Sequence, residues 1–153
     1  MNIADRTILD HFVHIRSRTL AMLQAAPEEM LSQKAAGEDH SLYWQFAHIA
    51  SGDNWWMHHV MKDGRGFVDD YPTEPQAILE RLTVSRDRVL NFFTAADGEA
   101  MGREFEFSDG DDGRTTWIGR DRVLYLTAHE LHHLGRAELA LWQFGATDLP
   151  TFP

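Results

Sequence analysis

The stretch Thr127-Ala128-His129-Glu130-Leu131-His132-His133-Leu134-Gly135-Arg136 places two histidines four residues apart within an apolar, helix-like run. An α-helix turns by about 100° per residue, so His129 and His133 lie one turn apart on one face, about 40° from each other. A helix presents two imidazole nitrogens to one divalent metal ion with this geometry. The leucines around them favour an inward orientation, in which each imidazole requires a metal or a hydrogen-bonding partner.

Two other interpretations fit the same residues. His129-Glu130-x-x-His133 is also the signature of zincin proteases, in which Glu130 would be the general base. That motif usually takes a third ligand further along the chain, where Glu138 and Asp148 are available. Glu138 points about 140° away from His133 on the same helix, which disfavours the protease. The remaining interpretation is a polar helix face whose histidines are solvated and bind nothing.

Composition narrows the possible functions. The chain has 153 residues, a formal charge of −10, no cysteine, and lysine only at Lys34 and Lys62. Its length fits a single domain over residues 1–153. The negative charge disfavours nucleic-acid binding, and the lack of cysteine leaves metal ligation to histidines and carboxylates. No apolar run approaches the about 20 residues of a membrane span, and no signal-peptide pattern opens the chain, so we expect a cytoplasmic protein.

Four segments show apolar residues at helical spacing, and capping or helix-breaking residues flank them. Ser41 is a good N-cap for the second segment, and Thr73-Glu74-Pro75-Gln76 predicts a capping box at the start of the third. Pro27 and Gly145 end the first and the fourth. The predicted helices span about 5–25, 42–61, 73–98 and 121–144.

Between the third and fourth helices the pattern changes to alternation. Phe105 and Phe107 alternate with glutamates, residues 108–113 are rich in Asp and Gly, and apolar residues return at 115–118. This predicts a short β-hairpin or extended loop. The aspartates also suggest an EF-hand-like calcium loop, but the spacing and the terminal Glu are missing, which favours a solvated turn. We therefore expect an all-α fold, a four-helix bundle with this insertion between helices three and four.

A bundle builds a metal site from side chains on facing helices, so the two histidines of the last helix need a partner elsewhere. His48 is the best candidate because it lies mid-helix in Phe46-Ala47-His48-Ile49-Ala50. A single histidine in such a run is more often a hydrogen-bonded core residue than a ligand. His59 lies about 16 Å further along the same helix and cannot share an ion with His48.

These features together resemble the DinB/YfiT-like superfamily over nearly the whole chain. The resemblance rests on Phe46-Ala47-His48-Ile49 followed by Trp55-Trp56, on the insertion at 105–117, on residues 128–136, and on the ending Phe144-Gly145-Ala146-Thr147-Asp148-Leu149-Pro150. It implies a four-helix bundle, often a homodimer. It also implies a divalent metal, zinc or nickel, held by three histidines, which here are His48, His129 and His133.

The resemblance further implies a reaction on a small molecule. Characterised members include thiol-dependent S-transferases and isomerases, so we expect a metal-dependent enzyme whose cosubstrate is a low-molecular-weight thiol. A hydrolase that uses metal-activated water, and a non-enzymatic metal-binding bundle, are the alternatives. The chain departs from the family at His133-Leu134-Gly135-Arg136, where the family commonly has His-Arg-Gly-Gln.

Three further residues are candidates for the site. Arg136 shares the face of His129, about 20° away, so it could hold a substrate carboxylate, or it could pair with a carboxylate of the chain. Glu130 lies about 100° from His129 and could act as a base only if that flank faces the cavity. Trp55 shares the face of His48 and could line the pocket, or it could be a core aromatic.

Overall fold

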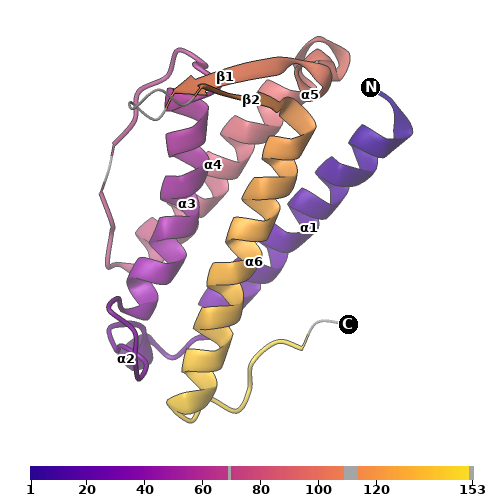
Figure 1. Cartoon of the computed structure of the whole chain (residues 1–153). Helices are drawn as coiled ribbons and strands as arrows, with labels where there is room; N and C mark the ends of the chain where they lie inside the picture. Colours follow the sequence, from indigo (N-terminus) through magenta and orange to yellow (C-terminus); the bar gives the residue numbers. More distant parts are fainter. Residues whose placement is uncertain (69, 109–113, 152–153) are drawn as a thin grey trace.

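Four long helices pack side by side in a computed structural model that describes residues 1–68, 70–108 and 114–151 (Figure 1). They are α1 (Ile3–Ala25), α3 (Leu42–His59), α4 (Pro75–Thr94) and α6 (Gly119–Gln143). α1 and α3 each pack against both α4 and α6, which closes the ring of a four-helix bundle. This confirms the expected all-α fold. None of the described helices combines the length and the apolarity that crossing a membrane requires.

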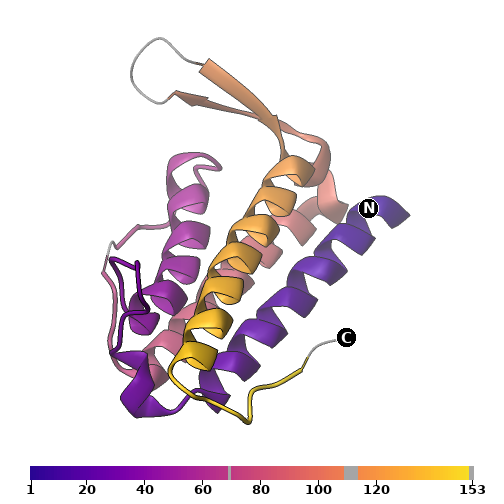
Figure 2. The same cartoon turned by 60° about the horizontal axis from the view of Figure 1, so that its bottom comes forward.

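Short elements connect the long helices. α2 (Glu28–Leu31) follows α1, while η1 (Ala95–Gly98) and α5 (Glu99–Gly102) follow α4. β1 (Glu104–Ser108) and β2 (Arg114–Ile118) then pair as an antiparallel hairpin in which Phe105 lies opposite Trp117. The hairpin extends from the start of α6 over one end of the bundle (Figure 2). The predicted hairpin is therefore confirmed, whereas most of the suggested turn or calcium loop, 109–113, lies outside the described residues.

Local chemistry explains where the helices begin. Ser41 caps α3 as predicted, because its side chain accepts a hydrogen bond from the backbone N–H of Trp44. The capping box predicted at Thr73 is wrong: Glu74 is the N-cap of α4 and makes no side-chain cap, and Pro75 supplies the fixed φ of the first turn. A Cβ on Gly119 would lie 1.9 Å from the carbonyl oxygen of Ala100, so only glycine allows α6 to begin against α5.

The ends of the helices also differ slightly from expectation. α4 ends at Thr94 rather than near Gly98, because Ala96, Asp97 and Gly98 all have positive φ and leave the helical path. α6 ends at Gln143, and Gly145 follows with a φ of 92°, which is the left-handed conformation expected of glycine after a helix.

Two apolar clusters fill the interior, one toward each end of the bundle. The cluster at the end where α3 begins is built around Met22, Leu23, Leu42, Phe46, Ile78, Leu82, Leu134 and Leu141. The cluster at the hairpin end is built around Leu9, Phe12, Met57, Val89, Phe93, Phe105, Val123 and Leu126. Along every long helix, buried polar residues lie between these two sets.

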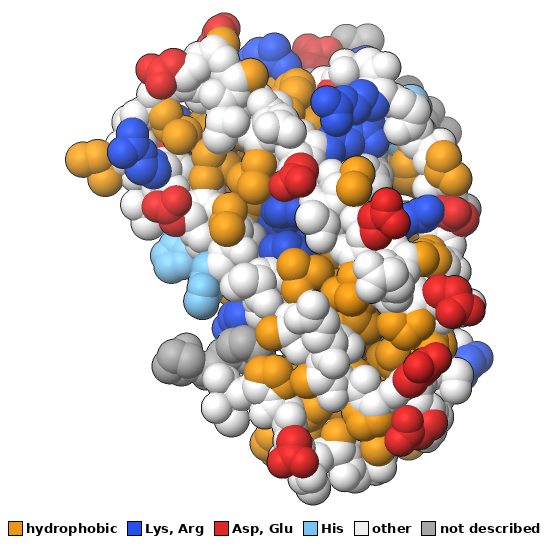
Figure 3. All heavy atoms as spheres, turned by 180° about the vertical axis from the view of Figure 1, so that it is seen from behind, with side chains coloured by type: hydrophobic (Ala, Val, Ile, Leu, Met, Phe, Trp, Pro, Cys, Tyr) orange, Lys and Arg blue, Asp and Glu red, His pale blue; other side chains and the backbone are white. Residues whose placement is uncertain are grey.

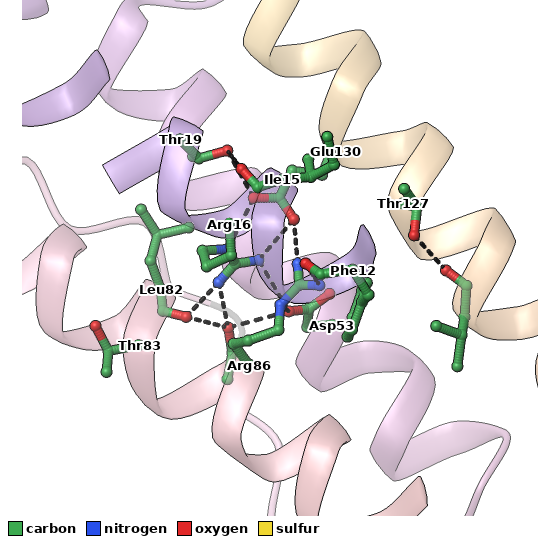
Figure 4. Close-up of polar contacts among 12 residues, drawn as sticks. Phe12, Ile15, Arg16, Thr19, Asp53, Leu82, Thr83, Arg86, Thr127 and Glu130 are labelled. Carbon is green, nitrogen blue, oxygen red and sulfur yellow. Dashed lines mark hydrogen bonds and ion pairs between the residues drawn. The ribbon is translucent and has the colours of Figure 1, made fainter. Parts of the chain in front are cut away.

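We call this polar level the buried ion layer; its members are Arg16, Thr19, Asp53, Ser85, Arg86 and Glu130. Arg16 donates from Nε to Glu130 Oε1 at 2.8 Å and from Nη2 to Asp53 Oδ2 at 3.0 Å (Figure 4). Arg86 donates to Glu130 Oε2, and Thr19 donates to Glu130 Oε1 at 2.6 Å. One layer of hydrogen bonds therefore joins all four long helices.

The charges of the layer balance one another. Burial by itself would raise the pKa of Glu130. The neighbouring Arg16 and Arg86 lower it by a larger amount, so the net pKa lies below its ordinary value. Burial lowers the pKa of Arg86 to about 10, which leaves the guanidinium charged at neutral pH. Two cations thus face two carboxylates in the interior.

Replacing Glu130 by Gln should destabilise the fold strongly. The variant leaves Arg16 and Arg86 buried with Asp53 as the one carboxylate of the layer, and breaking a buried pair in this way costs about 3–5 kcal/mol. Urea denaturation measures the difference in the free energy of unfolding. The control Glu80→Gln, on the exposed side of α4, should change it by less than about 0.5 kcal/mol. Equal losses in the two variants would contradict a stabilising role for the layer.

The same pair of proteins should differ in pH dependence. A carboxyl whose pKa is lowered by folding adds stability above its unfolded pKa of about 4.3, and this contribution is lost as the pH falls through the folded pKa. The stability advantage of wild type over Glu130→Gln should therefore shrink when denaturation is repeated at progressively more acidic pH. A constant difference would show that Glu130 is not ionised in the fold.

Candidate metal centre

Three histidines from two facing helices meet beside the buried ion layer. His48 on α3 and His129 and His133 on α6 each offer one ligand atom, and these atoms lie within 4.8 Å of one another. Ligands of a tetrahedral zinc ion stand about 3.4 Å apart, since each Zn–N bond is about 2.1 Å. Small rotations of the rings therefore suffice to seat one ion. The structure brings together the three histidines that the sequence singled out.

The surroundings favour the neutral form of His129 and His133. Burial, together with the neighbouring His129 and His48, lowers the pKa of His133 to about 3. Burial also lowers the pKa of His129, against an opposing effect of the Asp53 and Glu130 carboxylates. A neutral imidazole is the form that binds a metal, so protons compete weakly for these nitrogens at neutral pH.

Gln45 orients one of the ligands. The Nδ1 of His133 lies 2.7 Å from Oε1 of Gln45, a buried side chain on α3. An amide oxygen only accepts, so Nδ1 carries the proton and the lone pair of His133 is on Nε2. Gln45 was not predicted from the sequence as a partner of His133. The available signal was its position three residues before His48, which places both side chains near one face of the same helix.

Close packing also positions the other two rings. A Cβ on Gly52 would lie 2.7 Å from Cε1 of His129, so the ring of His129 occupies the space that any side chain at residue 52 would fill. Trp44 stacks on His48 with 4.2 Å between ring centroids and 12° between ring planes. The Tyr71 hydroxyl lies 3.5 Å from Nδ1 of His48. Backbone proximity and aromatic stacking thus limit the rotation of both imidazoles.

A pocket of about 230 Å³ opens beside the histidines. Its walls are largely aromatic and include Trp55, which is one of the two positions considered for that residue. The residues that line it are His48, Ser51, Gly52, Trp55, Trp56, Tyr71, Tyr125 and His129. A small molecule in this pocket would contact the metal ligands at one wall and flat apolar surfaces at the others.

Two other candidate residues lie away from this pocket. Glu130 is 1% exposed and belongs to the buried ion layer, so the flank of α6 that carries it faces the bundle interior. Arg136 forms a two-point ion pair with Glu38, donating from Nε to Oε1 at 3.0 Å and from Nη2 to Oε2. This is pairing with a carboxylate of the chain, one of the two roles considered for Arg136. His59 is exposed and packs on Trp55 and Phe67.

The sequence matches the DinB superfamily over residues 11–137, which include all three histidines. The chain belongs to the DinB superfamily. Members of this superfamily commonly bind a metal, and the three-histidine group here suits one.

The crystal structure of a DinB-like protein, YjoA from Bacillus subtilis, is similar to this DinB-superfamily chain in fold. The TM-score is 0.68 at 19% sequence identity, over 95% of this chain and 96% of that one. No functionally curated protein matches the chain. These similarities support the family and the fold of the chain.

Replacing Gln45 by Leu should weaken zinc binding by about 10- to 100-fold, the usual effect of removing the hydrogen-bond partner of a ligating histidine. The variant keeps the size of the side chain but leaves Nδ1 of His133 without an acceptor. Competition titration with a chromophoric chelator measures the affinity. The control Gln24→Leu, at an exposed position on α1, should bind zinc like wild type. An unchanged affinity in Gln45→Leu would mean that His133 does not ligate through Nε2.

Proposed function

We propose that the protein is a divalent-metal-dependent enzyme that acts on a small molecule, as a thiol-dependent S-transferase or isomerase. The observation that carries the proposal is the convergence of three imidazoles beside an aromatic pocket, two of them with a lowered pKa. Imidazole suits both zinc and nickel, and either ion fits the proposal. An ion held by three protein ligands keeps an open position, at which it lowers the pKa of a bound thiol or water.

The residues of the chain supply the rest of the site. Trp55, Trp56 and Tyr125 offer flat apolar surfaces that bind a substrate and exclude water from the reacting end. Gln45 and Gly52 hold His133 and His129 in place, as described above. Because the chain has no cysteine, the sulfur of a thiol reaction has to come from a cosubstrate.

Metal content is the first test. Protein purified without chelators should carry about one zinc or nickel ion per chain by elemental analysis. His48→Ala and His133→Ala should lose it. His59→Ala and His132→Ala are matched controls, one on each helix, and should retain it because both side chains are exposed. A metal-free wild type that also fails to bind added zinc would leave a non-enzymatic bundle as the function.

Cobalt substitution separates the candidate reactions. Addition of low-molecular-weight thiols to the cobalt-loaded protein should produce a sulfur-to-cobalt charge-transfer band, and His48→Ala should not show it. If no thiol gives the band while the metal-loaded protein turns over an ester or an amide, the protein is a hydrolase that activates water at the same three histidines.

We further propose that the protein is a homodimer that pairs through the outer face of α6. This face carries an exposed apolar stripe built from Leu124, Ala128, Leu131, Gly135, Leu139 and Trp142. At about 100° per residue these positions fall within about 60° of one line along the helix. On the side of the bundle opposite α6, by contrast, charged side chains lie among the apolar patches (Figure 3).

The stripe is complementary to itself in an antiparallel crossing. With the two-fold axis between residues 131 and 132, Ala128 meets the partner's Gly135, and Leu124 meets the partner's Leu139. Small residues opposite each other let two helices approach closely. Apart from its own helix backbone, no atom of the described residues lies within 4 Å of a Cβ placed on Gly135, although glycine within a helix costs about 1 kcal/mol relative to alanine. Contact with a second copy accounts for that glycine.

Leu131→Glu should convert the dimer to a monomer without unfolding it. Two carboxylates would then lie beside the two-fold axis, in place of two leucines. Light scattering coupled to size exclusion at micromolar concentration gives the mass, and circular dichroism verifies the helices. Val84→Glu, at an exposed apolar position on α4, is the matched control and should remain dimeric. A monomeric wild type refutes the dimer, and a monomeric Val84→Glu moves the interface to α4.

A further inference from the structure

Arg122 on α6 is a buried cation that forms no ion pair with any carboxylate of the described residues. Its side chain is 0% exposed, and no described residue forms a hydrogen bond with its Nε or Nη2. The other buried arginines, Arg16, Arg86 and Arg88, each form an ion pair with a carboxylate. Arg122 instead lies between two indoles, with its Cζ 3.4 Å from the ring centroid of Trp117 and 4.0 Å from that of Trp56.

The aromatic contacts stabilise the charge of Arg122 but provide no hydrogen-bond acceptor for its Nε and Nη2. Indole faces attract the charge of a guanidinium stacked on them, whereas its N–H bonds lie in the guanidinium plane and need acceptors at its edge. Burial lowers the pKa of Arg122 to about 10, against opposing effects of Tyr125 and Asp121, and the group is still charged at neutral pH. A planar cation with free edge donors is the group that proteins use to bind a carboxylate at two points.

Arg122 also lies in line with the metal ligands. It precedes His129 by seven residues, so on α6 it is about 20° from His129 in angle and about 10 Å from it along the helix axis. Two residues that its guanidinium contacts, Trp56 and Tyr125, at 4.0 and 5.0 Å from their ring centroids, line the pocket beside the histidines. No lysine or arginine is among the described residues that line this pocket.

We propose that Arg122, which lies behind the pocket walls formed by Trp56 and Tyr125, binds a carboxylate of the molecule that occupies this pocket when those rings turn aside. The ligand is then an elongated organic acid: one end reaches the three histidines, an apolar middle lies against the aromatic walls, and the carboxylate lies at Arg122. This assignment rests on the proposed function of the pocket as a substrate site. It places the charge recognition of the site at the hairpin end of α6, on the side away from Arg136 and its partner Glu38.

Ligands of graded length test the assignment on the cobalt-loaded protein. The probes are ω-mercaptoalkanoic acids of increasing chain length and the corresponding primary amides, and the readout is the affinity from the sulfur-to-cobalt band. Wild type should prefer the acid over the amide by roughly tenfold or more once the chain is long enough to span the pocket, as expected for a hydrogen-bonded ion pair. The shortest acids should show no preference.

Substitutions identify the group responsible. Arg122→Gln should abolish the preference for long acids, and Arg122→Lys, which keeps the charge but not the two-point geometry, should reduce it. Arg120→Gln is the matched control, because Arg120 is partly exposed and lies near Asp5 outside the pocket. Melting temperatures show whether each variant is folded. If Arg122→Gln unfolds, the Arg122→Lys result decides. An equal preference in wild type and Arg122→Lys, or none in wild type, overturns the proposal.

A second probe separates this proposal from the proposed function. Calorimetry with 3-phenylpropionate and its amide requires neither thiol nor turnover. Preference for the acid in wild type and not in Arg122→Gln supports the role of Arg122 even if no thiol binds the metal, in which case only the thiol chemistry fails. Thiol binding that does not distinguish acids from amides in either series overturns the role of Arg122 and leaves the proposed function intact.

Discussion

The ion pairs among Arg16, Arg86, Asp53 and Glu130 constrain the rest of this bundle. Each long helix contributes at least one member of the layer, and all four charges are withdrawn from water. Apolar surfaces above and below the layer tolerate small sliding movements, because contact between hydrocarbons has little directionality. Buried charges tolerate none, since a lost partner leaves a desolvated charge. The layer therefore fixes the position of the four helices relative to one another along the bundle axis.

These axial positions also determine the geometry of the candidate metal centre. Asp53 in the layer follows Gly52, and Glu130 follows His129, so the same peptide units carry both the ion pairs and the site. When Asp53 and Glu130 meet Arg16, Gly52 is brought against the ring of His129. The imidazoles thus stand on a rigid support, which keeps ligand geometry from depending on loops. Stability and ligand placement have a common origin in this bundle.

Local periodicity was enough to predict these elements: helical spacing indicated the bundle and the grouping of His129 with His133, and alternation indicated the hairpin. The buried ion layer was not predictable in the same way. Glu130 was interpreted within a metal motif, whereas its partner Arg16 lies 114 residues away in the sequence. The angle from His129 was correct, but the angle alone does not say which flank faces the cavity. Likewise, Glu38, the partner of Arg136, comes from an irregular segment without periodicity.

Gly52 carries a consequence for how such sites arise and disappear within a family. The space for the His129 ring exists because one residue of the opposite helix lacks a methyl group. A single codon change there would remove the vacancy while every ligand is retained in the sequence. Counting histidines is thus a poor guide to which related chains hold an ion. The residue that faces His129, here Gly52, is a better indicator of whether the ring has room to bind an ion. Its contribution is the absence of a side chain.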